Sequence, residues 1–214
     1  MLVDCTLRDG GYPNAWDFPT ELINDYLGAM ASISADYVEL GFRSLEHGTF
    51  RGGCAYTTDR FIRQMAVPPS LRLGVMVNAG ELARYPDGLE AALDVLFVNA
   101  GESPVSLVRI ASHFAELDEA LDASTWLRER GYVVGVNLMQ IADRSDAEIE
   151  EIANRASERP PDVLYFADSL GGMDAAQTSR IVALLRRGWT GPLGIHAHDN
   201  MGRALVNSLQ AIAD

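Results

Sequence analysis

Cysteine and histidine are scarce in this chain, and the scarcity of cysteine argues against a protein stabilised by disulfide bonds. Of its 214 residues only two are cysteine and four are histidine. Cys5 and Cys54 lie far apart and form no Cys-x-x-Cys motif, so the sequence predicts no disulfide framework. A reducing cytoplasm is therefore the expected location.

Basic residues are also few, with 17 Lys and Arg against 30 Asp and Glu and a formal net charge of -13. This balance argues against a general nucleic-acid binder or a binder of anionic membranes, which need clustered positive charge. It leaves room for a small anionic substrate, because one arginine and a metal ion can set a local field opposite to the global one. No window approaches the roughly 18 consecutive apolar residues of a membrane span, and no signal segment opens the chain. With 48% hydrophobic residues, we expect a single globular domain over residues 1–214.

Short apolar runs alternate with amphipathic stretches, the pattern of a βαβα parallel sheet. The stretch 78–103 is the least regular, with a helical pattern at 89–93 and an extended one at 95–98. Elsewhere the pattern predicts strands at 2–7, 37–42, 71–77, 106–111, 132–139, 162–167 and 193–198, and helices at 20–33, 59–65, 116–130, 146–157, 175–187 and 203–212.

Seven strand–helix units favour a TIM (β/α)8 barrel over an open doubly wound sheet. No Gly-x-Gly-x-x-Gly follows a strand, which counts against a dinucleotide-binding fold. A complete barrel has eight strands and about 250 residues. We therefore expect a barrel that lacks its last βα unit, which further sequence or a partner chain would supply.

Two motifs at opposite ends of the chain carry candidate chemistry. His196 and His198 are alternate residues of a predicted strand, so their imidazoles face the same way. Two imidazoles and one carboxylate from elsewhere make a divalent-metal site with open positions, as catalytic sites require. His-x-His is often incidental, but here it follows an apolar run at the carboxyl end of a strand, where parallel α/β proteins place their chemistry. Near the start, Arg8 would add a fixed positive charge beside Asp9, provided that the strand breaks at the pair Gly10-Gly11.

The segments Thr6–Gly10, Val38-Glu39 and His196–His198 together resemble the DRE-TIM metallolyases. These enzymes include hydroxymethylglutaryl-CoA lyase, isopropylmalate and homocitrate synthases, and 4-hydroxy-2-oxovalerate aldolase. The resemblance implies a TIM barrel in which three residues hold Mg²⁺ or Mn²⁺, namely Asp9, His196 and His198. The ligand types themselves leave other divalent metals, Zn²⁺ and Co²⁺, as alternatives. It also implies that Arg8 stabilises an enolate and that Glu39 is the acidic member of the motif.

Two further segments are most similar to the 4-hydroxy-2-oxo acid aldolase branch. One is His196–Asn200 followed by Ala204–Ser208, and the other is Asp168–Met173, which matches a substrate-contacting turn of that branch. Tyr12 departs from the pattern, because the aldolases carry at this position a histidine linked to proton transfer. A phenol is a weak base at neutral pH, so Tyr12 either transfers protons with help from its surroundings, donates a hydrogen bond or gates access. The asparagine ligand that lyases and synthases draw from an eighth strand has no counterpart here.

Several polar residues have a structural interpretation beside the functional one. Glu39 fits a buried strand-end carboxylate, and Asp168 and Ser169 fit an N-cap of the next helix. Asn137 lies at the expected catalytic face but could equally satisfy backbone groups. A structural role is expected for Arg109 and His113 and a packing role for both cysteines, whereas Asp199 and Asn200 could orient the histidines.

The sequence thus predicts a metal-dependent carbon–carbon lyase, an aldolase that cleaves or forms a 4-hydroxy-2-oxo acid through a metal-bound enolate. Arg8, Tyr12 and Glu39 are the predicted catalytic residues, and Arg8, Asn137, Asp168 and Ser169 the predicted substrate-binding residues. The expected partners are a 2-oxo acid and an aldehyde, with a homo-oligomer possible and no nucleic acid or membrane. The alternatives are a Claisen-type acyltransferase, a CoA-thioester lyase, or a silent barrel that keeps a metal without catalysis.

Overall fold

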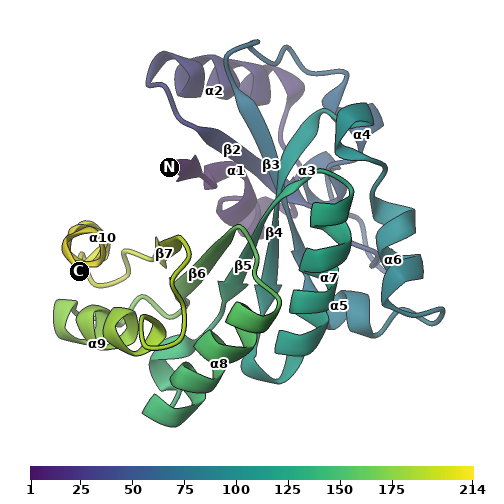
Figure 1. Cartoon of the computed structure of the whole chain (residues 1–214). Helices are drawn as coiled ribbons and strands as arrows, with labels where there is room; N and C mark the ends of the chain where they lie inside the picture. Colours follow the sequence, from purple (N-terminus) through teal and green to yellow (C-terminus); the bar gives the residue numbers. More distant parts are fainter. The chain divides into compact units, whose positions relative to one another are not determined.

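The computed structural model describes all 214 residues, and its seven strands are neighbours in chain order from β1 to β7 (Figure 1). The pairings of β1 with β2, β2 with β3, β5 with β6 and β6 with β7 are parallel. The residues form two compact units, Met1–Arg109 with Trp126–Val133, and Ile110–Thr125 with Val134–Asp214. Within each unit the carboxyl ends of parallel neighbours lie at the same edge of the sheet.

The first unit contains three complete strands and the start of a fourth. The strands are β1 (Val3–Asp4), β2 (Tyr37–Phe42), β3 (Arg72–Asn78) and β4 (Val105–Ser112), which continues into the second unit. The helices are α1 (Thr6–Asp9), α2 (Thr20–Ser32), α3 (Gly53–Tyr56), α4 (Asp59–Ile62), α5 (Ala79–Ala83) and α6 (Leu89–Leu96), with 3-10 turns η1 (Tyr12–Asn14) and η2 (Ala100–Glu102).

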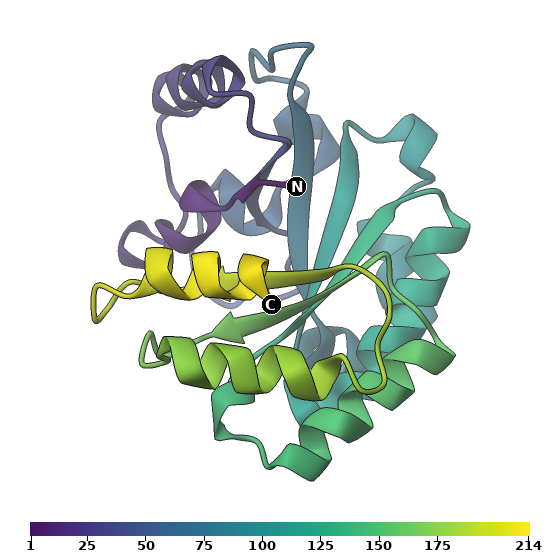
Figure 2. The same cartoon turned by 60° about the vertical axis from the view of Figure 1, so that its left-hand side comes forward.

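The second unit repeats the strand–helix alternation more regularly. Its strands are β5 (Val133–Leu138), β6 (Val163–Asp168) and β7 (Leu193–Ala197). Its helices are most of α7 (Leu117–Glu129), then α8 (Asp146–Glu158), α9 (Ala175–Leu185) and α10 (Ala204–Ala213), with 3-10 turns η3 (Phe114–Glu116) and η4 (Ile141–Asp143). Helix α9 lies between α8 and α10 (Figure 2). Helices α8 and α9 both begin with a capping box, Ser145 with Glu148 and Asp174 with Gln177, which satisfies the first backbone N–H groups.

The first strand differs from its prediction. It ends at Asp4, and Thr6–Asp9 form a helical turn where the sequence predicted extended chain to residue 7. The Asp4 carboxylate accepts hydrogen bonds from the backbone N–H of Thr6 at 3.1 Å and from its hydroxyl at 3.0 Å. Such local side-chain bonds compete with the sheet ladder, so the strand breaks ahead of Arg8 rather than at the glycines.

The predicted extended segment 95–98 is also wrong, because Val95 and Leu96 complete helix α6. Most of the large apolar residues are buried, but α10 is an exception. Its side chains Leu205, Val206, Leu209 and Ile212 are 56–80% exposed. No helix combines the length and the hydropathy needed to cross a membrane.

Candidate active site

Arg8 and Asp9 lie on the single turn of α1 and form a bidentate ion pair. The Arg8 Nη1 lies 2.7 Å from Asp9 Oδ1, and Nη2 donates to Oδ2 at 3.1 Å. The turn closes through hydrogen bonds from the Asp9 N–H to the Cys5 carbonyl and from the Gly10 N–H to the Thr6 carbonyl. It therefore presents the guanidinium and the carboxylate together just beyond the carboxyl end of β1, as the sequence required.

Glu39 on β2 holds Arg8 from the other side. Its side chain is fully buried, the Arg8 Nε donates to it, and Arg109 Nη1 lies 3.4 Å from both of its oxygens. Burial lowers the pKa of the Arg8 guanidinium, but the negative charges of Glu39 and Asp9 more than compensate, so the net pKa is raised. Arg8 is therefore a permanent, oriented cation.

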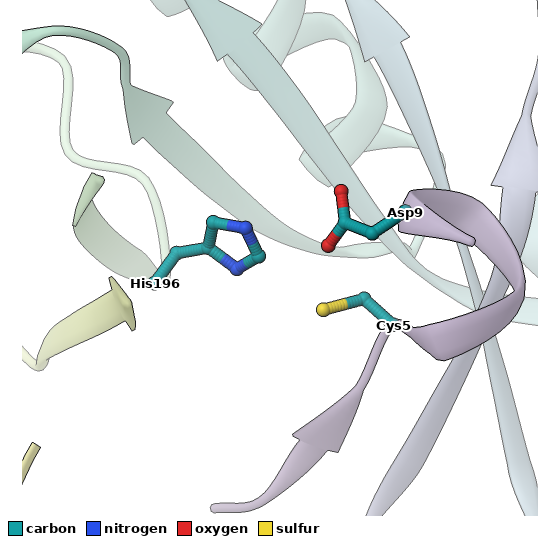
Figure 3. A group of neighbouring side chains, drawn as sticks. All are labelled: Cys5, Asp9 and His196. Carbon is teal, nitrogen blue, oxygen red and sulfur yellow. The ribbon is translucent and has the colours of Figure 1, made fainter. Parts of the chain in front are cut away.

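Cys5 lies near Asp9, although the sequence predicted only a packing role for this cysteine. Its sulfur and a carboxylate oxygen of Asp9 lie within 4.8 Å of one another. Figure 3 shows these two side chains on the segment after β1 and the imidazole of His196 on β7. Burial, with a contribution from the charge of Glu39, raises the pKa of the Cys5 thiol to about 12. At neutral pH the thiol is protonated, which makes it a poor nucleophile.

His196 and His198 lie side by side in the second unit, in keeping with the prediction that their imidazoles share one side of the strand. Their Nε2 atoms are 3.0 Å apart, and the rings meet edge to face. The His198 Nδ1 lies 3.0 Å from the Ser169 carbonyl. A carbonyl only accepts, so Nδ1 of a neutral His198 carries the proton and Nε2 keeps its lone pair.

This arrangement fits a divalent cation. Two nitrogen ligands at about 2.1 Å from one ion, at a right angle to each other, are about 3.0 Å apart, which is the spacing of adjacent octahedral ligands. A backbone carbonyl that fixes the tautomer of a ligating histidine is a frequent companion of such sites. The two imidazoles are therefore suitable ligands for the divalent metal that the resemblance implies.

Asp168 and Ser169 shape the turn after β6. The Asp168 carboxylate accepts backbone hydrogen bonds from Gly172 at 3.0 Å and Met173 at 3.1 Å. The Ser169 hydroxyl accepts one from the N–H of Gln140 at 3.0 Å. The suggested N-cap role of this pair is wrong, because Asp174 is the N-cap of α9.

The remaining predicted residues occupy different environments. Asn137 lies buried on β5, whereas Tyr12 on η1 is 62% exposed and packs against Trp16. Asp199 accepts a hydrogen bond from the N–H of Ala204, and the Asn200 amide donates to the Leu170 carbonyl. These contacts tie the segment after β7 to α10 and to the turn after β6.

Sequence reasoning missed two contributors to the site. Arg109 was expected to be structural, yet it completes the buried charge cluster around Glu39. The Ser169 carbonyl is a backbone atom, so no side-chain pattern could have indicated it.

A family model described as HMGL-like matches residues 99–214. The chain belongs to the HMGL-like family. Among curated relatives, the 4-hydroxy-2-oxovalerate aldolase of Pelotomaculum thermopropionicum is 29% identical over 214 residues, which are 99% of this chain and 60% of the relative. This HMGL-like chain thus spans about 60% of the length of the curated relatives it matches first.

Solved structures agree with this family and fold. The N-terminal domain of a Bacteroides vulgatus protein proposed to be an aldolase has a TM-score of 0.86 and 26% identity, covering 100% of this chain and 69% of that one. The HMG-CoA lyase of Bacillus subtilis, at a TM-score of 0.75 and 14% identity over 99% of this chain and 73% of that one, shows the fold alone. The predicted resemblance and the predicted α/β fold of TIM-barrel type, with seven of eight strands, are confirmed.

Proposed function

We propose that this chain is a divalent-metal-dependent carbon–carbon lyase, an aldolase that cleaves or forms a 4-hydroxy-2-oxo acid. The observation that carries the proposal is the His196–His198 pair, whose Nε2 atoms stand 3.0 Å apart with one tautomer fixed by a backbone carbonyl. Its family and its aldolase relatives support the choice of reaction.

Asp9, His196 and His198 are the proposed metal ligands. Asp9 lies on α1, which follows β1, and the two histidines lie at and just after the end of β7; in parallel α/β proteins the segments that follow strands carry the catalytic residues. Oxygen and imidazole ligands suit Mn²⁺ or Mg²⁺. A cation bound there would supply a Lewis acid for the 2-oxo group of the substrate.

The composition favours a metal over the other common device of aldolases. Those that work without a metal form a Schiff base between a lysine amine and the 2-oxo carbon. All 17 basic residues of this chain are arginine, so it offers no lysine amine. We therefore assign electron withdrawal from the 2-oxo group to a cation and to Arg8.

The residues other than the metal ligands are assigned separate roles in the reaction. In the cleavage direction a base takes the proton of the 4-hydroxyl, the C3–C4 bond breaks, and its electron pair becomes an enolate that is then protonated to the 2-oxo acid. We assign Arg8 to the developing oxyanion, Glu39 to the orientation of Arg8, and Tyr12 to proton transfer or hydrogen bonding. Asn137, Asp168 and Ser169 are proposed to line the substrate.

The proposal also includes a cellular location and self-association. Neither cysteine takes part in a disulfide, which supports a reducing cytoplasm as the location. The exposed apolar side chains of α10 support self-association, since such patches mark interaction sites. Light scattering after gel filtration tests this and would give a mass above 23.3 kDa.

The test of function is metal-dependent release of pyruvate from 4-hydroxy-2-oxopentanoate. Metal-free protein should release none, and added Mn²⁺ or Mg²⁺ should restore release. Borohydride with pyruvate should not inactivate the protein, because there is no lysine to trap. Release without metal, or turnover of hydroxymethylglutaryl-CoA instead, would overturn the assignment.

A further inference from the structure

Three aromatic side chains form a continuous cluster in the first unit. The Tyr12 and Trp16 rings have centroids 4.7 Å apart, Trp16 and Phe42 5.5 Å, and Tyr12 and Phe42 6.4 Å, all edge to face. We call these three rings the aromatic wall. Tyr12 is 62% exposed, and Trp16 and Phe42 are half-buried, so the wall reaches solvent.

The wall adjoins the guanidinium that we assign to the oxyanion. The Arg8 Cζ lies 5.7 Å from the centroid of the Phe42 ring. The indole N–H of Trp16 donates to the backbone carbonyl of Arg8 at 2.8 Å. Within this unit the wall thus contacts Arg8 at two points, with Phe42 beside the guanidinium and Trp16 at the backbone.

The backbone is distorted to place the wall there. Ala15 and Trp16 both have positive φ, 55° and 57°, a conformation that disfavours residues with a side chain. Trp16 lies so close to Gly11 that a Cβ at that position would come within 1.9 Å of the indole ring. Strain of this kind costs about 1–3 kcal/mol per residue and gathers at functional sites.

We propose that the aromatic wall binds the aldehyde half of the substrate and selects aldehydes with an aryl or extended apolar substituent. This inference rests on the proposed function and names its substrate class. An aromatic surface gains from contact with another ring or a long apolar chain, whereas a methyl group would cover little of it. Tyr12 then contributes its ring to specificity, whatever its hydroxyl contributes to proton transfer.

The experiment compares two aldehydes in the synthetic direction. The chain with Mn²⁺ is given pyruvate and either benzaldehyde or acetaldehyde, and the ratio of the two kcat/KM values is measured. The wild type should favour benzaldehyde. Tyr12→Leu and Trp16→Leu should each lower the ratio by about 2- to 10-fold, the scale of one lost aromatic contact.

Matched variants separate the rings from their polar atoms. Tyr12→Phe and Trp16→Phe keep a ring and should keep the ratio, even where both rates fall together. A wild-type preference for acetaldehyde, or an unchanged ratio in both leucine variants, would overturn the inference.

A reaction without aldehyde separates this failure from failure of the proposed function. Metal-dependent exchange of the pyruvate methyl protons in D₂O, followed by NMR, reports enolate formation alone. Exchange with an unchanged ratio refutes only the wall, whereas absence of exchange refutes both proposals.

Discussion

Replacing Glu39 with glutamine perturbs the buried charge cluster at one point. Glu39 has no exposed surface and accepts from Arg8 and Arg109, which are themselves 5% and 2% exposed. Glutamine keeps the shape and one acceptor oxygen but removes the negative charge. Arg8 would retain Asp9 as a partner, whereas Arg109 would lose the negative charge that Glu39 places 3.4 Å from its Nη1.

The size of the effect follows from these contacts. A hydrogen bond to a charged group contributes about 1.5–3 kcal/mol, so Glu39→Gln should lower the free energy of unfolding by about that much. Glu39→Ala would remove both carboxylate oxygens that accept from Arg8 and Arg109, and breaking a buried ion pair in this way costs about 3–5 kcal/mol. The free energy of unfolding of a domain is about 5–15 kcal/mol in total. The glutamine variant should therefore fold, whereas the alanine variant could lose most of its stability.

Urea denaturation measures the stability, and steady-state kinetics measure the orientation of Arg8. Weakening of the bond between Arg8 Nε and residue 39 should lower kcat by about 10- to 100-fold, the scale of a small misplacement of a reacting group. Glu129→Gln, on the exposed end of α7, is the matched control and should change stability by less than about 0.5 kcal/mol. Glu39→Gln combined with Arg109→Met should recover stability, because both buried charges are then removed. Glu39 does not orient Arg8 if Glu39→Gln behaves like the surface control in both measurements.

Three further outcomes are expected. Arg8→Lys should keep metal binding but lower kcat by about 10²–10³-fold, because a point charge does not reproduce the planar guanidinium; unchanged turnover would reject its role. Tyr12→Phe should remove one limb of the pH–rate profile if the hydroxyl transfers protons, whereas an intact profile with a changed KM would assign it to positioning. Burial raises the pKa of the Cys54 thiol to about 12, so its contribution to stability is complete below about pH 8.5 and is lost as the pH rises from there toward 12. Cys54→Ala should therefore lose less stability than wild type between pH 7.5 and 9.5 in urea titrations, and equal losses would contradict this.

The regular strands could be read from the sequence because their apolar runs are long enough to exclude other structures. Tyr37–Phe42 is predicted and found with the same bounds. The first strand could not be bounded, because its end depends on hydrogen bonds of Asp4 that outweigh an apolar pattern continuing to Leu7.

At the site, contacts between residues close in sequence could be predicted, whereas contacts between residues far apart in sequence could not. His196 and His198 are two residues apart, so strand geometry alone predicted that their imidazoles lie on the same side. Glu39 and Arg109 are 70 residues apart, and only the folded sheet brings them together. The N-cap of α9 was readable from the capping-box pattern Asp174-x-x-Gln177, which is a better match than Asp168.

A titration of Mn²⁺ followed by electron paramagnetic resonance measures whether Asp9, His196 and His198 bind one ion. A site shared by these three residues predicts one bound Mn²⁺ per chain. It also predicts that Asp9→Ala and His196→Ala each abolish binding, since removal of any one of three ligands should disrupt the site. Full Mn²⁺ affinity in Asp9→Ala, or no binding by the wild type, would contradict it.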